Sequence, residues 1–112
     1  MSTPERYDRK VKSDINFSGT GDNTVISAPG DGKHVEIDFC FLMVSLATTV
    51  QLKDGSTNWG GAFPLGDKGS LLVENTSGFH APIILSNNSS FIINQSGTSQ
   101  ISGWTMHRIQ GE

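Results

Sequence analysis

The sequence predicts an all-β protein, an antiparallel jelly-roll sandwich of about eight short strands with an extended N-terminal arm. Three observations lead to this fold class. The composition favours turns and strands, short β-branched or aromatic runs recur about every ten residues, and no stretch of eleven residues has helical apolar spacing without a Gly, Asn or Pro. Many short strands separated by turns are typical of an antiparallel sandwich or barrel.

The composition supports strands rather than helices and sets the size of the fold. Ser, Thr, Asn and Gly account for 43 of the 112 residues and charged residues for only 17%, and these small polar residues favour turns and β-structure. The apolar 35% is clustered, and a chain of this length buries enough surface for one core. We therefore expect an N-terminal arm over residues 1–13 and one sandwich domain over residues 14–112.

Apolar runs bounded by Gly, Asn, Asp, Ser or Pro mark the individual strands. Asp54-Gly55 predicts a hairpin turn, and Pro64 places its strand at a sheet edge or marks the strand's end. The chain lacks the Cys…Trp…Cys spacing of immunoglobulin domains, which favours a jelly roll. The eight or nine expected strands cover residues 15–17, 24–28, 34–41, 46–53, 59–65, 71–73, 83–85, 91–93 and 99–109.

The clearest alternation of apolar and polar residues lies between His34 and Phe41. It predicts one central strand with four side chains facing the core: Val35, Ile37, Phe39 and Phe41. Glu36 and Asp38 share the other face, which is interpreted as a solvated strand face, with a pair of working carboxylates as the alternative. Cys40 is the single cysteine, so an internal disulfide is excluded and a buried apolar role is expected.

Charge divides the chain unequally. Residues 1–12 carry a net +2 and the remainder −5, so the acidic body is a poor match for nucleic acid. The basic residues are expected to dock the arm on an acidic protein surface, with a solvated tail as the alternative: Arg6, Arg9, Lys10 and Lys12. The longest apolar run, Phe39 to Val44, is far shorter than a membrane helix, so we expect no membrane partner.

Motifs for chemistry are absent from the sequence. The three histidines, His34, His80 and His107, are widely spaced, and no serine lies in a Gly-x-Ser-x-Gly motif. No glycine-rich segment matches a phosphate-binding loop. We therefore expect a protein that is not an enzyme, with no catalytic residue, no metal and no cofactor. A small sugar-active or cupin-type enzyme is the more distant alternative.

Three aromatic side chains are candidate binding residues because they lie beside glycines and turns: Trp59, Phe63 and Trp104. Large aromatic side chains fill cores, anchor subunit interfaces, and stack on sugar rings. All three interpretations remain open at the level of sequence. The sugar-stacking interpretation predicts a carbohydrate-binding β-sandwich module, such as one on a phage fibre or tail.

The order of elements from Thr24 to Ile109 resembles the small capsid decoration proteins, also called staple or cement proteins, of short-tailed bacteriophages of the epsilon-fifteen type. The resemblance covers the body of the chain. It lies in the order of its strands and in the element Gly-Gly-Ala-Phe-Pro-Leu followed by a glycine turn, which is not a catalytic motif. The segments that carry it are residues 25–28, 34–41, 50–55, 60–65 and 101–109.

The resemblance implies a protein that binds the outside of the assembled phage head and staples neighbouring subunits of the major capsid protein. It implies no enzymatic activity and no cofactor, and it places the protein on the outer capsid surface of the virion after synthesis in the host cytoplasm. A homo-oligomer is expected, with a dimer favoured over a trimer. The basic segment from Thr3 to Lys12 stands where an arm reaching across the shell would be.

Overall fold

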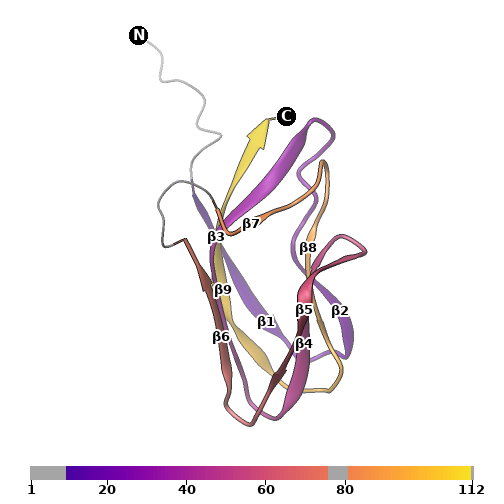
Figure 1. The fold of residues 1–112 in the computed structure, drawn as a ribbon, viewed down its shortest axis with the longest axis vertical. Coiled ribbons are helices and arrows are strands. Elements are labelled where there is room, and N and C mark those ends of the chain that lie inside the picture. Colours follow the sequence, from indigo (N-terminus) through magenta and orange to yellow (C-terminus); the bar gives the residue numbers. More distant parts are fainter. Residues whose placement is uncertain (1–9, 76–80, 112) are drawn as a thin grey trace.

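The computed structural model describes residues 10–75 and 81–111 and contains two antiparallel sheets packed as a sandwich (Figure 1). The predicted β-sandwich is confirmed, and the described residues contain strands but no helix. The strands are β1 (Val11–Phe17), β2 (Gly21–Ile26), β3 (Lys33–Val44), β4 (Thr48–Asp54), β5 (Thr57–Leu65), β6 (Ser70–Glu74), β7 (Ile83–Ile84), β8 (Phe91–Gln95) and β9 (Ile101–Gly111).

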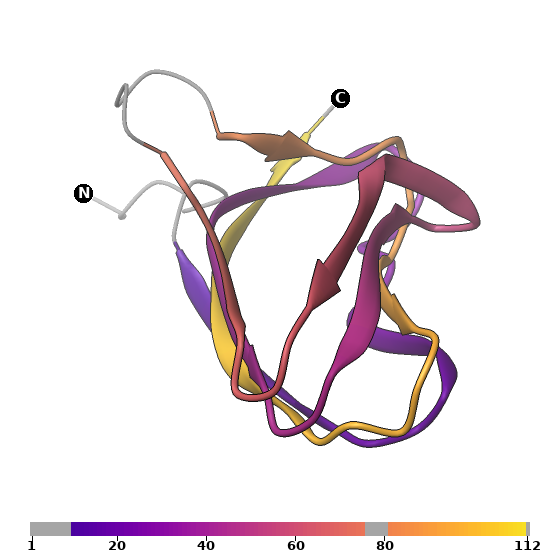
Figure 2. The ribbon, with the colours of Figure 1, turned by 60° about the horizontal axis from the view of Figure 1, so that its bottom comes forward.

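The strands pair in a nested order. Sheet A has the order β1-β9-β3-β6, with the short β7 also pairing with β3, and sheet B has the order β2-β8-β4-β5. The innermost pair is the hairpin β4–β5, and β3–β6, β2–β8 and β1–β9 enclose it in turn. The first half of the chain thus pairs with the second half as one long hairpin folded over into two layers (Figure 2).

The core lies between the two sheets and takes alternate side chains from each. Phe91 and Ile93 of β8 are fully buried opposite Ile37 and Leu42 of β3 in the same apolar cluster. Other buried members of this cluster are Ile15, Ile26, Val35, Cys40, Val44, Val50, Leu52, Ile83, Leu85 and Ile101. The core therefore draws on all strands except β5 and β6, whose larger side chains pack against it while partly exposed.

The central strand β3 differs from its predicted pattern. Val35 and Ile37 face the core as expected, but the prediction for Phe39 and Phe41 is wrong. The pairing of β3 with β9 shifts register between Ile37 and Phe39, so Asp38 is an extra residue in the strand. Such a β-bulge reverses the alternation. Beyond it the core face is taken by Cys40 and the residues that alternate with it, while Phe39 and Phe41 lie on the outer face.

Cys40 is buried in the core, as its apolar surroundings predict. Burial raises the pKa of its thiol to about 12, because a thiolate is poorly solvated between the sheets. The thiol is therefore a small apolar side chain at neutral pH rather than a nucleophile.

The first strand begins earlier than predicted. Its alternation was expected from Ile15, but β1 starts at Val11 and pairs along β9 from there. Lys12, expected on the arm, therefore lies within a strand of sheet A. Arg6 and Arg9 lie outside the described residues.

Candidate functional site

The outer face of sheet A carries a cluster of apolar side chains, here named the apolar patch. Its members alternate with core residues along three strands: Phe39, Phe41, Met43, Leu72, Trp104 and Met106. Strand register joins them, because Phe41 lies opposite both Trp104 and Leu72, and Phe39 lies opposite Met106. Leu72 is 50% exposed and Trp104 39%. The patch is an apolar surface in the middle of a sheet, half-buried at Phe39, Phe41 and Met106 and exposed at its other members.

Aromatic rings form the centre of the patch. The Trp104 ring stacks on Phe39 with centroids 5.5 Å apart and an interplanar angle of 24°. Phe41 lies on Trp104 at the same 5.5 Å centroid separation but tilted by 55°. Offset stacked and tilted pairs of this kind contribute about 0.5–1.5 kcal/mol beyond the area they bury. The three rings therefore hold one another in a fixed arrangement on the surface.

Gly103 permits the close approach of β3 and β9 beneath these rings. A Cβ atom at Gly103 would lie 1.9 Å from the carbonyl oxygen of Phe41, a distance that no side chain tolerates. Glycine at this position therefore lets the strand bring Trp104 directly beside Phe41.

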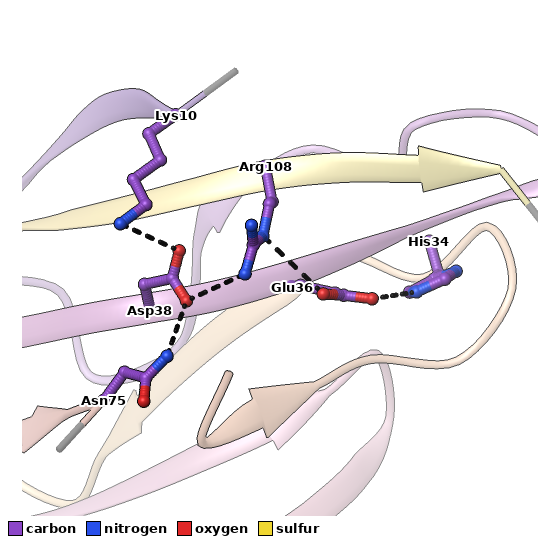
Figure 3. A network of polar contacts seen from close by, with 6 residues as sticks. All are labelled: Lys10, His34, Glu36, Asp38, Asn75 and Arg108. Carbon is purple, nitrogen blue, oxygen red and sulfur yellow. Dashed lines mark hydrogen bonds and ion pairs between the residues drawn. The ribbon is translucent and has the colours of Figure 1, made fainter. Parts of the chain in front are cut away.

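An ionic network adjoins the patch at the bulge (Figure 3). The Asp38 side chain is only 5% exposed, and its Oδ1 lies 3.4 Å from both Arg108 Nη2 and Asn75 Nδ2. Its Oδ2 lies 3.5 Å from Lys10 Nζ, from the residue just before β1. The backbone holds this arrangement, because the Asn75 amide donates a hydrogen bond of 2.9 Å to the Asp38 carbonyl. Residues from both ends of the chain and from its middle thus meet at one carboxylate.

Arg108 extends the network along the sheet. Its Nε lies 3.7 Å from Glu36 Oε1, while the other Glu36 oxygen, Oε2, lies 2.7 Å from His34 Nε2. One guanidinium therefore stands between the two carboxylates of β3 (Figure 3). The expectation of a solvated strand face is wrong for Asp38, because the bulge turns this residue out of the regular alternation and buries it.

A cavity of about 420 Å³ opens between the patch and the network. Its walls combine aromatic and apolar surface with one basic group, two carboxylates and an amide. The lining residues are Lys10, Asp38, Phe39, Glu74, Asn75, Trp104 and Met106. Such a combination can bind a group that has an apolar or planar portion and a polar or charged end.

The predicted binding residues that the structure describes lie in three places. Lys10 and Trp104 come together in the cavity, and Lys12 lies on β1, 3.3 Å from Asp14 in an exposed ion pair. Trp59 and Phe63 lie instead on β5 of sheet B, where both pack against the core. For these two aromatic residues the packing matches the core-filling interpretation.

Sequence reasoning missed most of the cavity. Phe39 was assigned to the core, and Asp38, Glu74 and Asn75 were given no role in binding. The run from Phe39 to Val44 is apolar at every position, so it fits the core in either register. Only the bulge at Asp38 decides between the registers. Two carboxylates in one largely apolar strand, Glu36 and Asp38, are the signal that could have revealed it.

The described residues form neither a metal centre nor a membrane-spanning helix. Within 10–75 and 81–111, no three His, Cys, Asp or Glu side chains gather as ligands for a metal ion. His80 lies outside these ranges, and His107 is buried on the core side of β9. No helix long and apolar enough to cross a membrane occurs in the described part of the chain.

Comparisons with known proteins add no further constraint. The chain matches no protein-family model, no curated protein and no solved structure. The site is therefore defined by its own geometry: an exposed aromatic patch beside an ionic network, with a cavity between them.

Proposed function

We propose that this protein is a capsid decoration protein, which binds the outside of an assembled phage head through the outer face of sheet A. There it staples neighbouring subunits of the major capsid protein. The observation that carries the proposal is the apolar patch, with three aromatic rings in contact at its centre and charged groups along its border.

The patch has the anatomy of a protein interface. Interfaces that bind proteins have aromatic residues at the centre, where water is excluded, and polar residues around them. Soluble monomers seldom leave a continuous apolar surface of several side chains exposed without a use for it. Leu72 and Met43, 50% and 45% exposed, extend the aromatic centre. This exposed sheet face is the surface that contacts the assembled shell in the proposal.

The strand order supports the jelly-roll topology on which the resemblance to capsid decoration proteins rests. In a jelly roll, one long hairpin is rolled into two four-stranded sheets so that the first strand pairs with the last. The nested pairs β1–β9, β2–β8, β3–β6 and β4–β5 follow this scheme, with β7 as a short addition that pairs with β3.

The mechanism requires no chemical step. A protein that binds only the assembled shell stabilises it by mass action, by about 2.7 kcal/mol per site when its concentration is a hundredfold above Kd. The effect repeats at every occupied site, so modest contacts resist the internal pressure of the genome. In this proposal the protein is a homo-oligomer, a dimer rather than a trimer, located on the outer surface of the virion.

Co-sedimentation with undecorated phage heads tests the proposal. The unaltered protein is expected to pellet with the heads, and Trp104→Ala to weaken binding by about 30-fold or more, since a central aromatic anchor contributes about 2 kcal/mol or more. Ile92→Ala is the matched control, because Ile92 is a partly buried apolar residue on the outer face of sheet B. Failure of the unaltered protein to bind any heads would refute the capsid function.

The basic arm has its own test. Because β1 begins at Val11, deletion of residues 2–9 removes Arg6 and Arg9 without cutting a strand. The deletion is expected to weaken binding to heads more at low salt than at high salt, because salt screens charge attraction. Equal binding by both proteins at both salt concentrations would reduce this segment to a solvated tail.

A second candidate function is carbohydrate binding, favoured by the ring platform of Trp104 and Phe39 beside the polar groups of Asp38, Glu74 and Asn75. Sugars stack on such rings and hydrogen-bond to carboxylates and amides at the side. Saturable glycan binding that is lost in Trp104→Ala and retained in Trp59→Ala would support this function, since Trp59 packs on the core.

A further inference from the structure

We propose that the cavity between β3, β6 and β9 receives a basic side chain of the partner protein, an arginine or a lysine. Its cation would lie beside the Trp104 ring and between the carboxylates of Asp38 and Glu74. This inference deepens the proposed function in that it supplies the recognition chemistry of the docking face. It requires that the partner is a protein with an exposed basic residue.

The Asp38 carboxylate is the first element of the site. It is 5% exposed, and its Oδ2 accepts no hydrogen bond from the described residues. Its contacts with Arg108 and Lys10, at 3.4 and 3.5 Å, are longer than good charge-assisted hydrogen bonds. A buried carboxylate oxygen without a close donor is poorly compensated for its lost hydration. An incoming N–H donor would supply the missing bond.

The charge balance of the site also selects a cation. Two basic groups, Lys10 and Arg108, stand against three carboxylates, those of Glu36, Asp38 and Glu74. Glu74 makes no ion pair with any residue that the structure describes. The charged groups that line the cavity, Lys10 against Asp38 and Glu74, carry a net −1, which one incoming cation neutralises. An anionic ligand would instead be repelled by the carboxylates of Asp38 and Glu74.

Lys10 shows that a cation can reach the Asp38 carboxylate. Its ammonium reaches Asp38 from the edge of the sheet, yet its side chain is 54% exposed and the ion pair is long (Figure 3). A weakly held ammonium of this kind can give way to a better donor. A guanidinium is better suited, because it is planar, stacks on aromatic rings, and binds carboxylates with two parallel hydrogen bonds.

The aromatic wall gives the site its second, independent feature. Trp104 is 39% exposed and is fixed from below by Phe39 and Phe41. A cation held near a tryptophan ring is attracted by the negative face of that ring. The cavity of about 420 Å³ has room for a guanidinium together with the apolar stem of its side chain, which would contact Met106 and Phe39.

The experiment uses the isolated protein and a small probe, N-acetylarginine methylamide, with the neutral citrulline derivative as its control. The protein has two tryptophans, so indole N–H resonances report the cavity through Trp104 and the opposite sheet through Trp59. We expect the arginine probe to shift the Trp104 resonance with millimolar affinity and to leave Trp59 unchanged. The citrulline derivative should bind at least tenfold more weakly.

Variants assign the effect to the carboxylates. Glu74→Gln, which lies on the exposed side of β6, should weaken probe binding about tenfold, and Lys10→Met should strengthen it by removing the competing ammonium. Asp22→Asn on sheet B is the control and should have no effect. An unchanged Trp59 resonance verifies that each variant is folded.

The outcomes separate the two proposals. No shift of Trp104 with the arginine probe, or an equal shift with the citrulline derivative, overturns the cation site even if the protein binds phage heads. A shift with methyl N-acetylglucosaminide but not with arginine overturns it in favour of the sugar site. Arginine binding without binding to heads keeps the site and refutes the capsid function. Binding of both is expected, with Glu74→Gln also weakening attachment to heads.

Discussion

The outer faces of the two sheets differ sharply, although both are made by alternate residues of paired antiparallel strands. The outer face of sheet A presents the apolar patch and borders it with charges that meet at Asp38. The outer face of sheet B is mostly polar, with Ile92 and Pro64 as apolar members, and its central polar side chains bond to one another. A polar surface is well solvated without a partner, whereas an exposed aromatic surface is stabilised when a partner covers it.

The contacts on sheet B form a continuous ladder. Asn94 donates a hydrogen bond of 2.7 Å to Asp22 Oδ1, and Lys53 lies 3.1 Å from both Asp22 oxygens. Next to them, the Gln51 amide donates to the carbonyl oxygens of Leu52 and Trp59. The hydrogen bond from Asn94, followed by that from Lys53, lowers the pKa of Asp22. The donors and acceptors of this face are thus used within the sheet.

The largest expected effect compares two phenylalanines. Phe91 is fully buried between the sheets, and Phe91→Ala should lower the free energy of unfolding by about 3–5 kcal/mol. Phe39→Ala, on the outer face of sheet A, should cost only about 1 kcal/mol, the value of its stacking on Trp104. Urea denaturation measures both. Equal losses would place Phe39 in the core and remove the patch from the surface.

A glycine pair tests how tightly each sheet is built. Gly103→Ala should destabilise the protein by about 1–3 kcal/mol, because its Cβ would meet the Phe41 carbonyl oxygen and force β3 and β9 apart. Gly61→Ala on β5 of sheet B should be neutral or slightly stabilising, since no atom lies within 4 Å of its added Cβ. Thermal melting distinguishes them. A harmless Gly103→Ala would contradict the close approach of strands beneath Trp104.

The two sheets should also respond to acid at different pH values. Burial lowers the pKa of His107 in sheet A. As the pH falls below 6.5, His107 of the unfolded chain is therefore protonated while His107 of the folded protein stays neutral. The contribution of His107 to the free energy of unfolding is therefore complete above pH 6.5. Below that pH it falls by at most about 1.4 kcal/mol per pH unit, until His107 of the folded protein is protonated too. Urea denaturation at several pH values should show this slope, and His107→Gln should abolish it. An unchanged slope in the variant would exclude His107 as its source.

The smallest effect belongs to sheet B. The pKa of Asp22 is lowered, so its contribution to stability is present above the ordinary pKa of 3.8 and is lost as the pH falls through the folded-state value. Because Asp22 is half exposed, Asp22→Asn should cost no more than the usual value of a surface ion pair, about 0.2–1 kcal/mol at neutral pH. Lys53→Met should cost a similar amount. A loss as large as that of Phe91→Ala would show that these polar contacts hold the fold together, and that they are more than weak contacts on an exposed surface.

The sequence predicted the sandwich and most of its strands, because alternation and turn residues act locally. It could not predict the bulge at Asp38, since every residue from 39 to 44 is apolar and either register buries an apolar face. It also could not distinguish Trp104 from Trp59. Both lie in strands beside glycines, and only the packing of the sheets places one outside and the other against the core.

The cavity was beyond sequence reasoning for a further reason. Its polar lining comes from the residue before β1, from the bulge in β3, and from the end of β6. Lys10 and Asn75 are 65 positions apart, yet both contact Asp38. Nested pairing of distant strands brings such groups together, and local patterns do not record it.

Hydroxyl-radical footprinting of the free and the head-bound protein tests whether the outer face of sheet A is the docking face. It compares residues on the two outer faces in a single experiment. If the outer face of sheet A is the docking face, binding should protect Trp104, Leu72 and Met43 from oxidation by severalfold and leave Ile92 and Pro64 of sheet B unchanged. Protection of Ile92 and Pro64, with Trp104 and Leu72 still reactive, would contradict docking through sheet A and place the contact on sheet B.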